Sequence, residues 1–222
     1  MQLNKICAKL KRIFTRPLRI TRLFSHQLAV NTLTDLYNDI PNWPVARSET
    51  IYVEDKIDNI LYGEITYESM EILAKKLSPS ARDVFYDLGC GIGRFVCYMY
   101  LTTSIKKSVG IEMVGSRYKL AELVAKLAEI EKFLDPRRKL EFIHNNIRNE
   151  HFSDATIIYM SSLCFPSELM EELNQKFLKL KKGLRIISLV PLPEHPSLKL
   201  KEVSTLPMTW NENSTIYYYK LI

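Results

Sequence analysis

The chain contains few cysteines, and none is placed for a metal site. Its 222 residues include four, Cys7, Cys90, Cys97 and Cys164, with no C-x-x-C pair and no H-x-x-x-H pair. Scattered cysteines of this kind are typical of reduced thiols in an intracellular protein. We therefore expect neither a disulfide framework nor a metal site.

Long hydrophobic runs are also missing from the sequence. No apolar stretch approaches the roughly 20 residues that a membrane-spanning helix needs. Hydrophobic residues make up 46% of the chain and charged residues 25%, which excludes a disordered composition. We predict an intracellular, soluble protein with no transmembrane segment, and the composition leaves its compartment open.

Acidic side chains are absent from residues 1–34, although this segment carries seven of the 31 basic ones. The rest of the chain, with 24 basic and 25 acidic residues, is nearly neutral. Apolar residues recur at helical spacing between Leu3 and Phe14, so we expect a basic amphipathic segment. Three roles stay open: packing on the body of the protein, binding an acidic polymer such as nucleic acid or a nucleosome, and targeting to an organelle or membrane surface.

Strand and helix patterns alternate from residue 83 onward. Expected strands cover 83–88, 107–112, 139–144, 155–160 and 184–190, and expected helices cover 93–102, 116–133 and 167–180, after an earlier one at 67–77. This alternation predicts an α/β fold, with a mostly parallel sheet and helices on both faces. Residues 199–206 and 214–221 predict two more strands, joined by a polar loop at 211–213, so the sheet should end in an antiparallel hairpin. A Rossmann-like, seven-stranded sheet of this kind is typical of class I methyltransferases.

A glycine-rich turn follows the first expected strand. The strand ends at Asp87-Leu88, and Gly89, Gly91 and Gly93 alternate after it in the pattern D-x-G-x-G-x-G. This pattern is not the dinucleotide fingerprint G-x-G-x-x-G. Glycines let the backbone approach a ligand closely, and the carboxylate of Asp87 would face a cationic amino group. We therefore predict S-adenosylmethionine as the cofactor.

A second acidic residue supports this prediction. Glu112 ends the next strand, 19 residues beyond Gly93, where a carboxylate can accept hydrogen bonds from both ribose hydroxyls. After the third strand, Asn146 could accept a bond from the adenine amino group through its carbonyl oxygen, or could be a turn residue. Both interpretations of Asn146 stay open.

Several segments resemble the Disruptor of Telomeric Silencing (Dot) family, the non-SET histone lysine methyltransferases. The matching segments are Tyr62–Glu64, Asp83–Gly89, Val109–Glu112, Phe165–Met170, Lys182–Ser188, Thr209-Trp210 and Tyr217-Tyr218. They cover roughly residues 58–222 in the family's order. The glycine turn is shared by all class I enzymes, whereas the Tyr-Gly-Glu segment and the terminal Trp with paired Tyr are more particular to this family.

The resemblance implies that the Tyr62–Glu64 loop folds over the cofactor, and that Trp210 and Tyr217 line a channel for a lysine side chain. An alkyl ammonium group between aromatic faces gains burial and cation–π attraction. Three positions depart from the family pattern: Ser161-Ser162 replaces paired asparagines, Arg94 replaces a glutamine, and Asn146 replaces an aspartate. We expect no dedicated general base, because methyl transfer to an amine needs alignment and desolvation, with Ser161 and Tyr217 as hydrogen-bond acceptors near the amine.

The predicted function is S-adenosylmethionine-dependent transfer of a methyl group to a lysine of a protein, such as a histone or another basic protein. An RNA or small-molecule methyltransferase of the same fold, and a cofactor-binding scaffold, are the alternatives. Expected parts of the chain are a basic amphipathic segment at 1–34, a mainly helical lead-in with a cofactor-covering loop at 35–80, and the catalytic domain at 81–222. Candidate catalytic residues are Tyr62, Ser161, Trp210 and Tyr217; candidate cofactor-binding residues are Tyr62, Glu64, Asp87, Gly89, Cys90, Gly91, Gly93, Arg94, Glu112, Asn146, Ile147 and Ser161.

Overall fold

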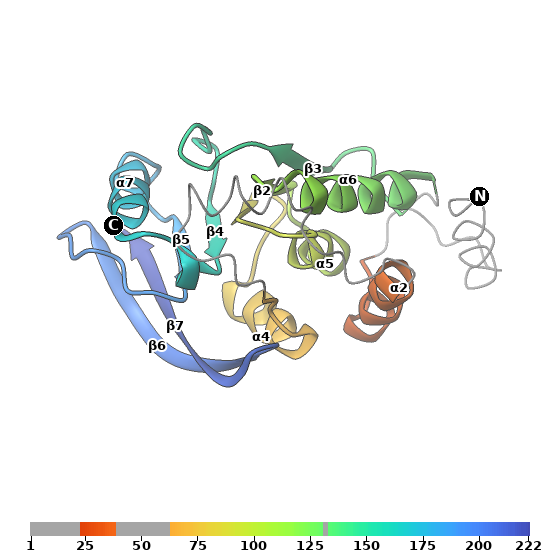
Figure 1. Ribbon diagram of the computed structural model, residues 1–222, viewed down its shortest axis with the longest axis horizontal. Helices are drawn as coiled ribbons and strands as arrows, with labels where there is room; N and C mark the ends of the chain where they lie inside the picture. The colour runs from red at the N-terminus through yellow and green to blue at the C-terminus, as the bar shows by residue number, and fades with distance from the viewer. Residues whose placement is uncertain (1–22, 39–62, 131–132) are drawn as a thin grey trace.

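A computed structural model describes residues 23–38, 63–130 and 133–222 (Figure 1). The amphipathic pattern expected between Leu3 and Phe14 therefore lies outside the described residues, as does the candidate residue Tyr62.

The described part of the chain is built on one seven-stranded sheet. Its strands are β1 (Val84–Leu88), β2 (Lys107–Glu112), β3 (Lys139–His144), β4 (Ile157–Met160), β5 (Arg185–Ser188), β6 (Leu198–Met208) and β7 (Asn211–Leu221). They lie in the order β3-β2-β1-β4-β5-β7-β6. The first five are parallel, β7 runs antiparallel to β5, and β6 runs antiparallel to β7. The predicted α/β fold, a mostly parallel sheet closed by an antiparallel hairpin, is confirmed.

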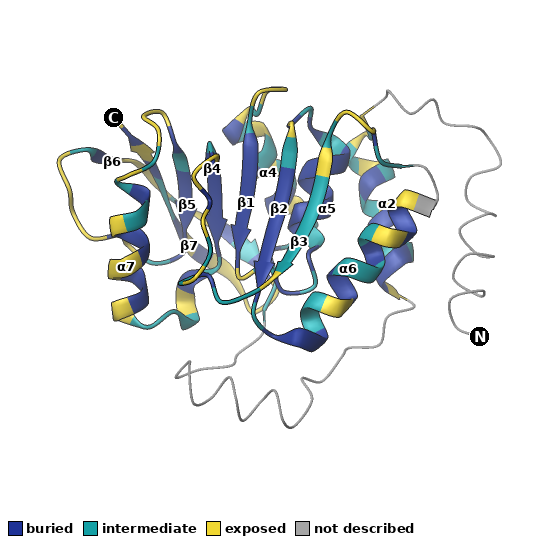
Figure 2. Ribbon diagram, turned by 90° about the horizontal axis from the view of Figure 1, so that it is seen from above, coloured by how far each residue is buried: buried dark blue, intermediate teal, exposed yellow. Residues whose placement is uncertain are grey.

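Helices cover both faces of this sheet. The α-helices of the described residues are α2 (His26–Asn38), α4 (Tyr67–Leu77), α5 (Arg94–Thr102), α6 (Gly115–Ile130) and α7 (Ser167–Phe177). Strand β1 shows why two faces are needed, because Phe85 packs into the core shared with α2, α4 and α5, while Tyr86 and Leu88 pack into the core shared with α7. Figure 2 shows β1 and β4 buried throughout, as expected for central strands of a parallel sheet.

Helix α2 was not predicted from the sequence. It crosses the boundary expected between residues 34 and 35, in a segment that we had divided by its charge. Ala29, Leu33 and Leu36 lie at helical spacing and are fully buried, so an apolar signal was present within a polar composition. The hydroxyl group of Tyr37, near the end of the helix, donates to the carbonyl oxygen of Ile92, 2.9 Å away in the glycine-rich turn.

The C-terminal hairpin is longer than expected. Strand β7 begins at Asn211, although the polar residues 211–213 predicted a loop, and Asn211 pairs with Met208 of β6. The side chains of these residues are exposed while their backbone is paired in the sheet. Their polarity therefore reflects contact with solvent and does not mark the end of a strand. The turn of the hairpin is therefore only Thr209-Trp210.

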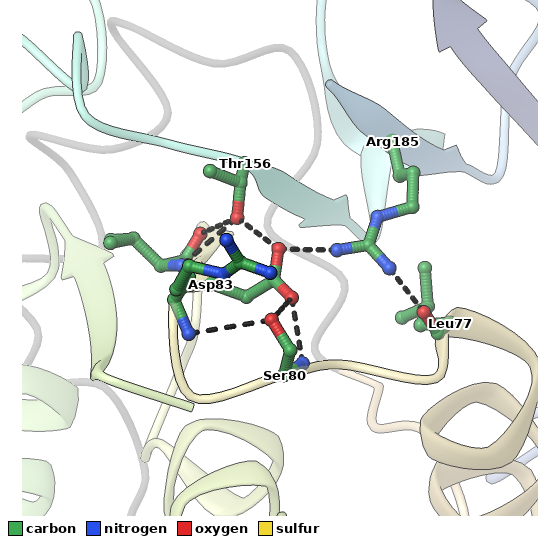
Figure 3. Close-up of polar contacts among 7 residues, drawn as sticks. Leu77, Ser80, Asp83, Thr156 and Arg185 are labelled. Atoms are coloured by element: carbon green, nitrogen blue, oxygen red, sulfur yellow. Dashed lines mark hydrogen bonds and ion pairs between the residues drawn. The ribbon is translucent and has the colours of Figure 1, made fainter. Parts of the chain in front are cut away.

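A polar network joins the amino ends of β1, β4 and β5 (Figure 3). The glycine-rich turn lies at the opposite end of β1, after Leu88. Arg185, at the start of β5, donates to the carboxylate of Asp83 and to the carbonyl oxygen of Leu77 at the end of α4. The hydroxyl group of Thr156 donates to Asp83 at 2.8 Å, and the backbone N–H of Ser80 donates to it at 2.7 Å. Burial raises the pKa of Asp83, but these hydrogen bonds and the charge of Arg185 outweigh it, so the pKa lies below its usual value. The network fixes α4 against the sheet.

Candidate active site

A cavity of about 320 Å³ lies at the carboxyl ends of β1, β2 and β4, where ligands bind in open α/β sheets. Its walls come mainly from six segments: the turn after β1, the end of β2 with the start of α6, the loop after β3, the segment after β4, the loop before α4, and the hairpin turn. Of the candidate residues within the described ranges, the lining includes Glu64, Asp87, Gly89, Cys90, Gly91, Arg94, Glu112, Asn146, Ile147, Ser161 and Trp210.

The turn after β1 needs its glycines for conformation and for space. Gly89, Gly91 and Gly93 have φ values of 81°, 57° and 82°, in the left-handed region that other residues rarely adopt. A Cβ atom on Gly93 would also lie 2.4 Å from Cε1 of Phe142, a separation that real side chains do not show. The turn therefore brings bare backbone to the floor of the cavity.

Asp87 has a buried oxygen atom that is without a partner among the described residues. Its side chain lines the cavity, the residue is only 3% exposed, and its Oδ1 has no hydrogen bond to any residue that the structure describes. Burial raises the pKa of Asp87 well above its usual value, and the charge of Glu112 raises it further. A cationic group of a ligand would supply the missing hydrogen bond and compensate the buried charge.

Glu112 is also buried, but both of its oxygens are bonded. Oε2 accepts from the backbone N–H of Gly91 at 2.8 Å, and Oε1 accepts from that of Val114 at 2.7 Å. Burial raises the pKa of Glu112, while these N–H donors and the charge of Arg117 oppose the rise. Each oxygen keeps a further lone pair, so the carboxylate can still accept two hydroxyl groups.

The two acids fit S-adenosylmethionine. Asp87 ends β1 and Glu112 ends β2, and these strands are neighbours in the sheet. The unpartnered oxygen of Asp87 suits an amino group, and the lone pairs of Glu112 suit a pair of ribose hydroxyls.

The loop after β3 forms the wall beyond Glu112. The side-chain oxygen of Asn146 accepts from the backbone N–H of Arg148 at 2.9 Å, which is a turn-forming bond. Asn146 and Ile147 nevertheless line the cavity. Both interpretations of Asn146 are thus compatible with its position, because its oxygen has a second lone pair.

The loop before α4 is fixed to the hairpin turn and to α5. Backbone and side-chain bonds of 2.9 Å join Glu64 to Thr209 in both directions. The carboxylate of Glu64 pairs with the guanidinium group of Arg94 at 3.1 Å, and that group lies 4.8 Å from the ring centre of Tyr37. The Tyr-Gly-Glu segment therefore reaches the cavity through Gly63 and Glu64, as the resemblance implied for their place in the fold.

An apolar rim borders the cavity near the segment after β4. Leu163 is 53% exposed and Trp210 is 39% exposed, although both line the cavity. A Cβ atom on Gly63 would lie 2.0 Å from Cε3 of Trp210, so the indole ring packs directly on the backbone of this glycine. Exposed apolar groups around a cavity mouth are suited to a long aliphatic side chain.

Tyr217, which was expected near the amine, lies elsewhere, and Ser162, the neighbour of the candidate Ser161, has a structural role. Tyr217 is in β7 opposite Ser188, packs against the core beneath α7, and is not among the described residues that line the cavity. Ser162, next to the candidate Ser161, is buried and shares a 2.8 Å hydrogen bond with Ser188. Of the serine pair, only Ser161 faces the cavity.

Sequence reasoning missed Tyr159 and Phe165 as lining residues. Tyr159 lies beside Asp87 in the register of β1 and β4, so the end of the fourth strand was the available signal. Burial raises the pKa of Tyr159, and the charge of Asp87 adds to the rise, so the phenol stays neutral. The ring of Phe165 lies close to Gly89, at 3.3 Å from where its Cβ would be.

Residues 23–38, 63–130 and 133–222 contain no group of three or more His, Cys, Asp or Glu side chains that could hold a metal ion. Within these same ranges, every helix is too short or too polar to span a bilayer.

Comparison with solved structures shows the class I methyltransferase fold. An RNA methyltransferase from Salinibacter ruber in complex with S-adenosyl-L-homocysteine has a TM-score of 0.53 and 22% identity, covering 68% of this chain and 89% of that one. TrmN from Thermus thermophilus has a TM-score of 0.51 and 15% identity, covering 69% and 48%.

Curated relatives are lysine methyltransferases. The H3 lysine-79 specific histone-lysine N-methyltransferase of Caenorhabditis elegans is 33% identical over 137 residues, which are 57% of this chain and 14% of that protein. A protein-lysine N-methyltransferase of Saccharolobus islandicus is 32% identical over 109 residues, 49% of this chain and 63% of that protein. The chain thus covers less than two thirds of either relative. The model of the family "Histone methylation protein DOT1" matches residues 46–208, nearly three quarters of the chain, and the chain belongs to this family.

Proposed function

We propose that the protein transfers a methyl group from S-adenosylmethionine to the side-chain amine of a lysine in a protein substrate. The observation that carries the proposal is the buried carboxylate of Asp87 beside Glu112, over a glycine floor that opens to an apolar rim; the Oδ1 atom of Asp87 has no partner among the described residues. Membership of the DOT1 family and the lysine methyltransferases among the relatives support the same activity.

Named residues would hold each part of the cofactor. Asp87 would bind the amino group, Glu112 the ribose hydroxyls, and Asn146 with Ile147 the adenine side, while Arg94 lines the methionine side. When bound, S-adenosylmethionine supplies an electrophilic methyl group. The glycine turn would bring backbone groups to the ligand without the obstruction of side chains.

The rim would prepare the substrate lysine. Trp210 and Leu163 exclude water from the aliphatic chain, and the indole ring attracts its ammonium group. Desolvation lowers the pKa of that ammonium group, so the neutral amine becomes accessible near neutral pH. The hydroxyl group of Ser161 would accept a hydrogen bond from the amine and orient it, and the amine proton would leave to water at the rim.

The substrate class is proposed from the relatives. A histone, or another basic protein, is the favoured substrate because the curated relatives include H3 lysine-79 specific enzymes and an archaeal protein-lysine enzyme. Residues 1–34, with seven basic and no acidic side chains, would bind an acidic polymer such as nucleosomal DNA. Deleting them should weaken substrate binding and flatten its salt dependence, with cofactor affinity unchanged.

Transfer of a radiolabelled methyl group tests the function. The full chain would be incubated with histone octamers, nucleosomes, total RNA and cell lysate, and label on lysine in protein is the expected result. The matched controls are Trp210→Ala, which should lose transfer but keep binding to S-adenosylhomocysteine, and Asp87→Asn, which should weaken both. Label in RNA alone, stable to protease, would overturn the lysine assignment.

A further inference from the structure

The loop between β3 and β4 lines the cavity at four consecutive residues, Asn145 to Arg148. Strand β3 lies beyond β2 in the sheet, so this loop lies on the far side of Glu112 from Asp87. If Glu112 binds the ribose, the adenine ring extends toward this loop. The shape of residues 145–150 then decides how well the base is received.

Bonds within the loop fix its local shape. The side chain of Asn145 accepts from the backbone N–H of Asn146 at 2.8 Å and donates to the carboxylate of Glu150 at 2.6 Å. Asn146 in turn accepts from the N–H groups of Arg148 and Asn149, through its side chain and its carbonyl oxygen. These contacts are internal, so they do not attach the loop to the rest of the protein.

Lys176, in the last turn of α7, makes that attachment. Its ammonium group donates to the carbonyl oxygens of Ile147 at 3.2 Å, Arg148 at 2.5 Å and Glu150 at 3.1 Å. An ammonium group has three N–H donors, so the three carbonyl oxygens use all of them. The same nitrogen lies 5.6 Å from the ring centre of Phe152, just beyond the loop.

Ile147 also anchors the loop by burial in the core that includes α7, but the other polar attachments are at its margins. Asn145 donates its backbone N–H to the backbone carbonyl oxygen of Glu112 at 3.2 Å where the loop begins. Arg148 pairs with Glu172 of α7 at 2.9 Å, but both side chains are more than a third exposed, so this pair contributes little. Lys176 alone contacts three carbonyl oxygens in the middle of the loop, among the described residues.

We propose that Lys176 is a positioning residue for the adenine half of the cofactor: from α7 it holds the loop of residues 145–150 in the shape that receives the base. The inference rests on the proposed function, because it assumes an adenosyl ligand. It assigns no chemistry to Lys176, which acts on the cofactor only through the loop.

The test compares Lys176→Met with Lys179→Met. The first substitution replaces an ammonium group with three donors by an apolar side chain of similar length. The second changes an exposed lysine three residues further along the sequence, two residues after the end of α7. Hydrogen exchange of the free protein should show the amides of Arg148 and Asn149 exchanging about tenfold faster or more in Lys176→Met only. Equal acceleration in β1 would show a general loss of stability and would overturn the assignment.

Binding then connects the loop to the ligand. Calorimetry with 5′-methylthioadenosine, which lacks the amino-acid half, should show affinity reduced about tenfold or more by Lys176→Met and unchanged by Lys179→Met. Transfer assays should show a higher KM for the cofactor with an unchanged kcat at saturation. Wild-type affinity in Lys176→Met would overturn the inference while leaving the proposed function intact.

The two failures can be separated. A wild-type protein that binds neither S-adenosylhomocysteine nor 5′-methylthioadenosine would contradict the proposed function itself, and with it any role of Lys176 in adenine binding.

Discussion

Replacing Asp87 with asparagine should stabilise the protein without ligand while weakening the cofactor site. The carboxylate is buried, its Oδ1 has no partner among the described residues, and its pKa is raised well above the usual value by burial and by Glu112. An unsatisfied buried polar group costs about 1–3 kcal/mol, and more when it is charged. The neutral amide removes the charge at nearly constant volume. We expect a gain of about 2 kcal/mol, which raises Tm by about 4–8 °C for a chain of this length.

The gain should depend on pH in a defined direction. Because the pKa of Asp87 is raised in the folded state, the unfolded chain releases its proton first as pH rises. Wild-type stability is therefore lost between about pH 3.9, the ordinary value for aspartate, and the raised pKa of the folded state. Asparagine does not titrate, so the difference in stability between variant and wild type should be larger at pH 8 than at pH 5.

Ligand should remove most of the stability advantage of the variant, from about 2 kcal/mol to less than about 1 kcal/mol. At a ligand concentration of 100 times its Kd, the wild type gains about 2.7 kcal/mol from mass action. Loss of one charged hydrogen bond weakens binding about ten- to hundredfold, so the variant gains only about 0.4–1.4 kcal/mol at the same concentration. Denaturant unfolding with and without S-adenosylhomocysteine measures both effects.

Glu112→Gln is the matched control, since it removes the neighbouring buried charge. Both oxygens of Glu112 accept hydrogen bonds from backbone N–H groups. In the glutamine variant, one of these N–H groups would face the side-chain NH2 group, which cannot accept a hydrogen bond. We therefore expect no gain in stability for this variant. If Asp87→Asn were less stable than wild type, or if its advantage were the same at pH 5 and pH 8, the account of Asp87 as an uncompensated acid would be wrong.

Three further substitutions probe the surroundings of the site. Gly63→Ala places a methyl group 2.0 Å from the ring of Trp210, so it should displace the indole and raise KM for the protein substrate about tenfold, with S-adenosylhomocysteine affinity unchanged in calorimetry. Ser78→Gly should stabilise the protein by about 1 kcal/mol in denaturant unfolding, because Ser78 ends α4 with a left-handed φ of 42°; a loss of stability would contradict this. Arg185→Leu leaves the partly buried Asp83 without its cation, so the free energy of unfolding should fall by about 2 kcal/mol, and a fall below about 1 kcal/mol would show that Asp83 needs no partner.

The sheet could be predicted from sequence because its signals are local. Strand β1 is a short apolar run that is followed by the glycine-rich turn, and β2 is a short strand that ends at Glu112. The bounds of both were predicted to within one residue. The cofactor-side acids followed from the same rule, since the carboxyl ends of neighbouring parallel strands meet at one edge. Asp87 and Glu112 both line the cavity, as expected.

The walls of the cavity depend on contacts that no local pattern records. Trp210 reaches the rim because its hairpin turn bonds to Glu64, 145 residues away from Thr209 in the sequence. Tyr217 and Ser162 both carry hydroxyl groups suited to the chemistry. The register of the sheet pairs Tyr217 with Ser188 of β5, and the buried hydroxyl group of Ser162 is hydrogen-bonded to the hydroxyl group of Ser188. Sequence spacing along a strand cannot distinguish a side chain that lines the cavity from one that packs in the core.

Arg94 stands where the family pattern has a glutamine, and neighbouring residues compensate the positive charge that it adds. Arg94 is the first residue of α5, and a cation at the amino end of a helix is opposed by the helix dipole. Glu64 supplies a carboxylate at 3.1 Å, and the ring of Tyr37 lies 4.8 Å from the guanidinium group. Because Glu64 is itself bonded to Thr209 of the hairpin turn, the added charge joins α5, the loop before α4 and the hairpin around one side of the cavity. The arginine therefore adds an ion pair to the wall of the cavity, and the positions of Asp87 and Glu112 are not affected.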